Sequence, residues 1–353
     1  MNGKERITRI LAGALPDRVP LYDTYWETTV ERWHREGLPN DKSPQLYFGT
    51  DELAGIGGAY TMQFPERVLF QNLTEKKYWD NDGALRIDKH VEEGWTSQWL
   101  DFTIKNQNDW MKYRHQMAFN PSRIYKSTVD HYHHAQSRGS FICYSGHGCF
   151  HPTWMRLGME TMLMLMLDDP DFIYDMFAAH AQLIIDIFEG MQKTGLSFDG
   201  AFIADDLGYR TSSLISPSLY RELVFPHHKR LCDHFAQYNL KTFLHTDGNI
   251  TGLIPHFIDA GFAGLHPLEA KADLDIRELK PLYGDKLVFF GNIDVTKLTG
   301  SREDIEDEVL NKLAIAKANG GYIYHSDHSV PNDISFSNYA YLIDLLLRYG
   351  RYD

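Results

Sequence analysis

Short apolar runs alternate with amphipathic stretches along the chain from about residue 140 onward. Six runs of strand length are each followed by a helical pattern, and they cover residues 140–146, 200–206, 241–247, 263–269, 286–294 and 322–329. A succession of strand-then-helix units predicts a parallel sheet with crossover helices. Each run is apolar on both faces, which is typical of parallel strands that are covered on both sides. The hydrophobic pattern therefore predicts an α/β fold.

Polar residues gather where these runs end. They are Asp205, Asp206, His245, Asp247, His266, Glu269, Asn292, Asp294, His325, Asp327 and His328. A barrel would bring the carboxyl ends of its strands around one mouth, whereas an open doubly wound sheet would spread them along an edge. No glycine-rich dinucleotide turn follows any of the runs. We therefore predict a single (β/α)8 TIM barrel that forms one domain over residues 1–353.

The first 140 residues carry weaker signals. Residues 19–26, VPLYDTYW, fit the first strand of the barrel. Residues 76–90 alternate between apolar and polar positions around Asn81, Asp82 and Gly83, and an Asn-Asp-Gly turn is typical of a β-hairpin. We expect this hairpin to be an N-terminal excursion from the barrel.

Composition narrows the class of protein. The formal net charge is −13, so a nucleic-acid backbone is not expected as a partner. Three cysteines without a CxxC pair indicate a reducing cytoplasm. The longest apolar stretch, residues 159–170, is too short to span a bilayer. We expect a cytoplasmic protein that acts on a small molecule and touches neither nucleic acid nor membrane, with a homodimer as a candidate assembly.

A His-x-Asp pair is the strongest candidate for chemistry. His245 and Asp247 share one face of a strand because they are two residues apart. Such a pair suits a corner of a metal site or an acid–base pair, although a histidine held by a carboxylate for packing is an equal alternative. Glu269 and Asp327 end two later strands, and imidazole and carboxylates bind zinc or harder divalent ions. We predict a metal site of His245, Asp247, Glu269 and Asp327, with metal-free substrate binding as the alternative.

Two further groups are candidates for catalysis and substrate binding. Asp205 and Asp206 are adjacent, so repulsion is expected to raise the pKa of one of them, and only one can face the cavity. We favour Asp206 as an acid–base residue beside His245 and His328. The glycine-rich segment 144–154 carries His147, Cys149 and His151, and a pocket-lining loop with His147 at the substrate is favoured over a thiol nucleophile.

Several segments resemble the uroporphyrinogen decarboxylase superfamily. They are DRVPLY, DDLGYRTSSLISPSLYRELVFPHHKRL, HTDGNITGLIPHFIDAGFAGLHPLEAKADLDIRELKPLYG, LVFFGNIDV and SDHSVPNDISFSNYAYLIDLLLRYGRY. The resemblance covers nearly the whole chain and implies a (β/α)8 barrel. True uroporphyrinogen decarboxylases carry an arginine-rich N-terminal motif that binds the substrate's carboxylates. Here that segment holds Asp23, Tyr25, Trp26 and Glu27, so an octacarboxylate substrate is not expected.

The other branch of the superfamily consists of corrinoid-dependent methyltransferases. In them, and in a related cobalamin-independent methionine synthase, a His-x-Cys strand end and a cysteine near the last strand hold zinc, and in the synthase a glutamate on the intervening strand does so as well. By that resemblance His245 and Glu269 keep their roles, whereas Asp247 and Asp327 stand where the cysteines would be. An oxygen-rich site suits polarisation of an oxygen better than activation of a thiol.

The resemblance therefore implies methyl transfer from a small methyl ether to a corrinoid on a separate protein. An aryl methyl ether is the candidate substrate. Zinc or another divalent metal is the expected cofactor. Tyr25 and Trp26 would suit a flat aryl group, with a role in the core equally open, and Asn292 completes the candidate substrate residues. The alternatives are a decarboxylase or lyase for a smaller carboxylate, and a barrel that binds a ligand without turnover.

Overall fold

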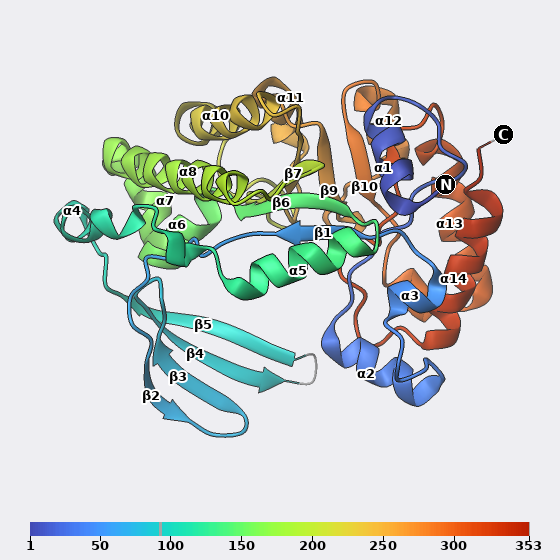
Figure 1. Ribbon diagram of the computed structural model, residues 1–353, viewed down its shortest axis with the longest axis horizontal. Helices are drawn as coiled ribbons and strands as arrows, with labels where there is room; N and C mark the ends of the chain where they lie inside the picture. The colour runs from blue at the N-terminus through green and yellow to red at the C-terminus, as the bar shows by residue number, and fades with distance from the viewer. Residues whose placement is uncertain (92–93, 353) are drawn as a thin grey trace.

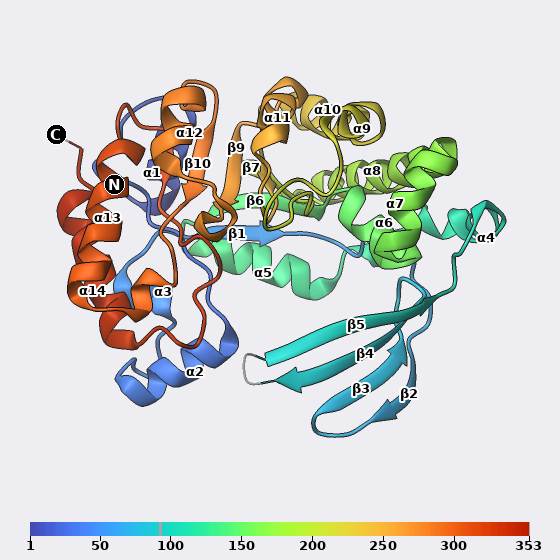
Figure 2. The ribbon, with the colours of Figure 1, turned by 180° about the vertical axis from the view of Figure 1, so that it is seen from behind.

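A parallel sheet forms the centre of the molecule in the computed structural model, which describes residues 1–91 and 94–352 (Figures 1 and 2). Its order is β1-β6-β7-β8-β9-β10-β11, and every neighbouring pair is parallel. The strands are β1 (Leu53–Ile56), β6 (Phe141–His147), β7 (Gly200–Ala204), β8 (Lys241–His245), β9 (Gly264–Leu268), β10 (Val288–Gly291) and β11 (Tyr322–Ile323). The six strand runs from residue 140 onward are confirmed as β6 to β11. Strand β1 was not predicted.

The segment expected as the first strand lies between the two ends of this sheet. Leu21 forms an isolated parallel bridge with Tyr324, just beyond β11, and its carbonyl accepts the main-chain N–H of Asp51 at 2.7 Å, just before β1. Pro20 lacks an N–H and so cannot donate to a continuous ladder. The described residues thus show a curled parallel sheet of seven strands. Its closure into an eight-stranded (β/α)8 barrel stays a prediction.

Asp23 fastens the same segment to the far end of the chain. Its buried carboxylate accepts the hydroxyl groups of Tyr324 at 2.8 Å, Tyr339 at 2.9 Å and Ser326 at 2.9 Å. Asp23 belongs to the segment where, by the resemblance above, the decarboxylases carry arginines. Here its carboxylate accepts hydrogen bonds from side chains that lie 301 to 316 positions later in the sequence.

Helices connect the parallel strands and cover the sheet. In Figure 1, α8, α10 and α11 lie toward the upper left and α12, α13 and α14 toward the right. No helix within the described ranges is both long and apolar enough to cross a bilayer. A π-helical turn at Tyr220–Val224 precedes α10. The helices are α1 (Gly3–Leu11), α2 (Glu27–Glu36), α3 (Pro44–Phe48), α4 (Gln107–Tyr113), α5 (Lys126–Ser137), α6 (Phe150–Leu157), α7 (Met159–Asp168), α8 (Pro170–Lys193), α9 (Pro217–Leu219), α10 (Phe225–Ala236), α11 (Ile254–Ala260), α12 (Ile276–Tyr283), α13 (Arg302–Ala316) and α14 (Phe336–Tyr349).

A second, antiparallel sheet projects away from the first (Figure 1). It consists of β2 (Arg67–Gln71), β3 (Glu75–Trp79), β4 (Ala84–Val91) and β5 (Gly94–Phe102), in that order. The predicted hairpin is confirmed as β3 and β4, and Gly83 in its turn has a φ of +80°, which glycine adopts without strain. The sheet meets the rest of the molecule at α6, where the rings of Trp99 and Trp154 lie 5.1 Å apart.

Candidate functional site

Three oxygen and nitrogen donors converge where β7 and β8 end. Asp206, His245 and Asp247 each offer one ligand atom, and these atoms all lie within 4.8 Å of one another. His245 Nε2 is 3.7 Å from Asp206 Oδ1 and 3.8 Å from Asp247 Oδ1. Asp247 Oδ1 is buried and has no hydrogen-bond partner among the described residues. These three residues are called the strand-end cluster below.

His151 connects the strand-end cluster to helix α6. Its Nδ1 lies 2.7 Å from Asp206 Oδ2. Burial lowers the pKa of His151, but the hydrogen bond and charge of Asp206 outweigh it and leave that pKa raised. Burial acts in the opposite sense on Asp206, and its bond to His151, with the charges of His151 and His245, leaves its pKa below the ordinary value. The expectation of a raised pKa is therefore wrong for Asp206, because the hydrogen bond to His151 and the charges of His151 and His245 outweigh the effect of burial.

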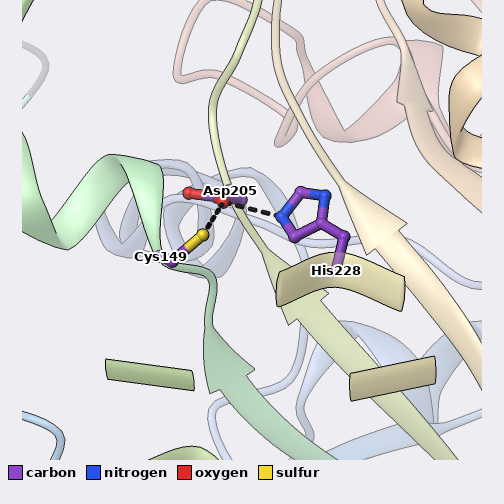
Figure 3. Close-up of side chains that lie close together, drawn as sticks. All are labelled: Cys149, Asp205 and His228. Carbon is purple, nitrogen blue, oxygen red and sulfur yellow. Dashed lines mark hydrogen bonds and ion pairs between the residues drawn. The ribbon is translucent and has the colours of Figure 1, made fainter. Parts of the chain in front are cut away.

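Asp205 points away from the strand-end cluster and anchors α6. Its fully buried carboxylate accepts the main-chain N–H groups of Phe150 at 3.1 Å and His151 at 2.6 Å. His228 Nε2 lies 2.9 Å from Asp205 Oδ2, and Cys149 Sγ lies 4.0 Å from the same oxygen (Figure 3). Asp205 and Asp206 thus have different roles, because successive side chains at a strand end point in opposite directions.

Cys149, Asp205 and His228 form a second group close enough to hold a cation in the described part of the chain. All three side chains are buried, and burial raises the pKa of the Cys149 thiol well above its ordinary value. The other ring nitrogen of His228, Nδ1, lies 3.0 Å from the hydroxyl oxygen of Tyr220. Since N–H groups already occupy both oxygens of Asp205, this group acts as a hydrogen-bonded anchor for α6.

Glu269 and Asp327 belong to neither of these groups. Glu269 accepts the main-chain N–H of Gly248 at 2.7 Å, and burial, followed by the charge of Asp247, raises its pKa. Asp327 accepts the N–H of Val295 at 2.9 Å, while burial raises its pKa to about 6. The structure therefore brings together two of the four predicted ligands and adds Asp206. Ligation by Glu269 and Asp327 stays a prediction.

A row of histidines leads from the strand-end cluster into the interior of the curled sheet. His245 Nδ1 lies 2.8 Å from His266 Nδ1, and the rings of His266 and His325 lie 4.3 Å apart. Burial lowers the pKa of His266 well below its ordinary value. The hydrophobic pattern places His266 and His325 at strand ends, but nothing in their spacing assigns them a role.

The remaining predicted substrate and catalytic residues occupy several places. Asn292 is buried, and its amide bonds the main chain at Ile276, Leu268 and Leu274, which braces the loops after β9 and β10. The hydroxyl group of Tyr25 lies 2.9 Å from that of Tyr339. Neither residue is among those that line the cavity described next.

Trp26 and His328 face each other edge to face, with ring centroids 6.1 Å apart. They lie where residues 19–26 meet the segment after β11. Their predicted roles, and those of Tyr25 and Asn292, stay predictions.

A cavity of about 790 Å³ lies between the ends of β1 and β6 and the base of the second sheet. His147 and His151 line it, so His151 faces both the cavity and the strand-end cluster. Arg156 also lines it, but its guanidinium is occupied by Asp82 at 2.7 Å and by the carbonyl of Tyr60 at 2.8 Å. The apolar and aromatic part of the wall consists of Ala59, Tyr60, Phe64, Pro65, Tyr125, Pro152 and Met155.

Comparison with known proteins gives a family and a fold. Residues 152–349, more than half of the chain, match the family model described as uroporphyrinogen decarboxylase (URO-D). No curated protein matches the sequence significantly. A solved methyltransferase from Methanosarcina mazei is 15% identical over 99% of both chains, with a TM-score of 0.65. A Bacillus subtilis mannanase is 10% identical over 95% of this chain and 87% of its own, with a TM-score of 0.45.

Proposed function

Because this chain belongs to the uroporphyrinogen decarboxylase family, we propose that it is an enzyme that moves a methyl group from a small methyl ether to a corrinoid on a separate protein. The observation that carries the proposal is the strand-end cluster, in which one imidazole and two carboxylates converge. The likeness in fold to a methyltransferase along almost the whole chain supports it. The proposal includes closure of the curled sheet into a (β/α)8 barrel by residues 19–22.

The strand-end cluster fits a divalent cation. Asp247 Oδ1 is a buried carboxylate oxygen without a hydrogen-bond donor, which is costly unless a cation or a ligand satisfies it. We propose that Asp206, His245 and Asp247 hold zinc or a harder divalent ion, with Glu269 beside them. When bound, such an ion supplies a Lewis acid for an oxygen atom.

The cavity next to His151 suits the substrate. Aromatic and apolar side chains form part of its wall, and Asp82 already neutralises Arg156, so we favour an uncharged aryl methyl ether over a carboxylate. When the bond between methyl carbon and oxygen breaks, the methyl group passes to the reduced corrinoid and the oxygen needs a proton. His151, whose Nδ1 faces Asp206, lines the cavity and is our candidate for the proton donor.

Decarboxylation of a smaller carboxylate is the second candidate, and the family match itself favours it. It would use Asp206 as an acid–base group without a metal. The lowered pKa of Asp206 supports this role poorly, because a general acid at neutral pH needs a raised pKa. Release of carbon dioxide from small carboxylates by metal-free protein would favour this candidate.

Methyl transfer is tested with the purified protein, reduced cobalamin and a panel of aryl and alkyl methyl ethers. We expect the absorbance of methylcobalamin to grow with at least one aryl ether and the rate to fall at least 100-fold in His245→Ala. A matched variant, His256→Ala, should keep the rate, since His256 is not part of the cluster. Failure of all donors with metal-loaded protein would overturn the proposal. A cytoplasmic location and a homodimer stay part of it as predictions.

A further inference from the structure

His266 is a buried polar residue in the middle of β9 whose presence the proposed function leaves unexplained. It is only 5% exposed. Its Nδ1 lies 2.8 Å from Nδ1 of His245, and its Nε2 has no hydrogen-bond partner among the described residues. A leucine would fill such a position without an unpaired nitrogen, so the contact with His245 is what distinguishes the histidine.

The short distance between the two Nδ1 atoms limits where the protons lie. Between two neutral imidazoles one nitrogen must donate and the other must accept. If His245 donates from Nδ1, its Nε2 is bare and faces the oxygens of Asp206 and Asp247 at 3.7 and 3.8 Å. Three lone-pair donors that face one another repel unless a cation lies among them. If His266 donates instead, His245 Nε2 carries a proton and cannot bind a cation.

The ring of His266 is fixed by its neighbours. Phe202, Phe290 and His325 have ring centroids 5.2, 5.7 and 4.3 Å from it. Dense packing of this kind holds a side chain in one rotamer. Nδ1 of His266 therefore remains directed at His245.

We propose that His266 is a positioning residue whose Nδ1 accepts a hydrogen bond from the Nδ1–H of His245 and so leaves His245 Nε2 free for a divalent cation. The inference rests on the cation site of the proposed function. In other proteins, partners that orient a ligating histidine typically change metal affinity 10- to 100-fold. His266 would do so through imidazole, in place of the more usual carboxylate or carbonyl.

Zinc and manganese titrations of the full chain, followed by calorimetry, test this role. His266→Leu should weaken zinc binding about 10- to 100-fold. His266→Asn, whose amide oxygen can take the place of Nδ1, should bind within about threefold of the wild type. Thermal unfolding of both variants controls for damage to the fold. Equal affinity of His266→Leu and wild type, or no metal binding by the wild type, would overturn the inference.

Nitrogen-15 NMR of the histidine rings in the wild type gives an answer that needs no variant. With zinc, His245 should carry its proton on Nδ1, and a proton on Nε2 would contradict the inference. Metal binding with the expected ranking of variants but no methyl transfer from any ether would support the inference and remove only the proposed function.

Discussion

Asp247 and Asp206 illustrate how far local spacing predicts a site. His245 and Asp247 were predicted to share a face because two-residue spacing on a strand is sufficient to place them, and their 3.8 Å approach agrees. The pairing of His151 on α6 with Asp206, just after β7, joins residues that are 55 positions apart. No local pattern predicts such a contact, although the histidines of segment 144–154 were noted.

The charge and softness of Asp247 should determine which ion binds. In Asp247→Cys we expect metal binding to persist with a shift from manganese toward zinc, because thiolate is the softer ligand. In Asp247→Asn we expect both ions to bind at least tenfold more weakly, because a negative charge is lost. Titration of zinc and manganese into both variants measures this. Equal affinities in the wild type and both variants would remove Asp247 from the site.

His227 should make the protein sensitive to acid. Burial, with smaller effects of His228 and Arg230, lowers the pKa of His227 to about 4 from 6.5. Between these values the unfolded chain binds a proton that the folded chain does not, so the free energy of unfolding falls as the pH falls from 6.5 to 4. The loss is at most about 3 kcal/mol.

Urea unfolding at pH 7 and pH 5 measures this effect. His227→Gln should lose less stability between the two values than the wild type does. His133→Gln, at an exposed histidine, should behave as the wild type. The same pH dependence in all three proteins would contradict the prediction.

Helix α6 is the element that brings the cavity, the second sheet and the strand-end cluster together. Asp205 holds its first N–H groups, and Arg156 on its last turn bonds Asp82 in the β3–β4 turn. The sequence predicted the β3–β4 turn because Asn-Asp-Gly is a local signal. It did not predict β1, whose four residues, LAGI, lack the length and pattern that distinguish a strand, nor the pairing of β2 and β5 with the hairpin.

Close packing at the start of α6 should make Gly148 intolerant of a side chain. A Cβ atom at Gly148 would lie 2.2 Å from Asp205 Cγ, whereas one at Gly146 would lie 3.5 Å from the nearest atom, in the ring of Tyr60. We expect Gly148→Ala to displace Asp205 and to lower the free energy of unfolding by at least about 2 kcal/mol. Gly146→Ala should cost less than about 1 kcal/mol. Denaturant unfolding of the pair is the measurement, and similar losses would refute the role of Asp205.

At the scale of the whole molecule, hydrophobic alternation predicted the parallel α/β architecture because each strand-then-helix unit is local. The family match covers residues 152–349, and apart from the β3–β4 hairpin and β6 the fold of the preceding 151 residues depends largely on contacts that no local pattern predicts. Asp23 is one example, because its hydrogen bonds to Tyr324 and Tyr339 span 301 and 316 positions of the sequence. From the sequence, Asp23 is significant only because it stands in the segment where the decarboxylases carry an arginine-rich motif.

The fastening of residues 17–25 to the last thirty or so residues has a consequence for synthesis on the ribosome. Val19 bonds Gly350 and Tyr352 bonds Asp17, in addition to the contacts of Asp23. At about 5 to 20 residues per second, the segment waits roughly 15 to 60 s for its partners. During that time the carboxylate of Asp23 and the side of residues 20–22 that bonds Tyr324 have no native neighbour, and contacts of such long sequence separation form slowly. We expect protease to cleave a stalled chain that ends at residue 319 within residues 17–60, whereas the full chain should resist cleavage there. Chaperones that bind nascent chains should bind within the same residues.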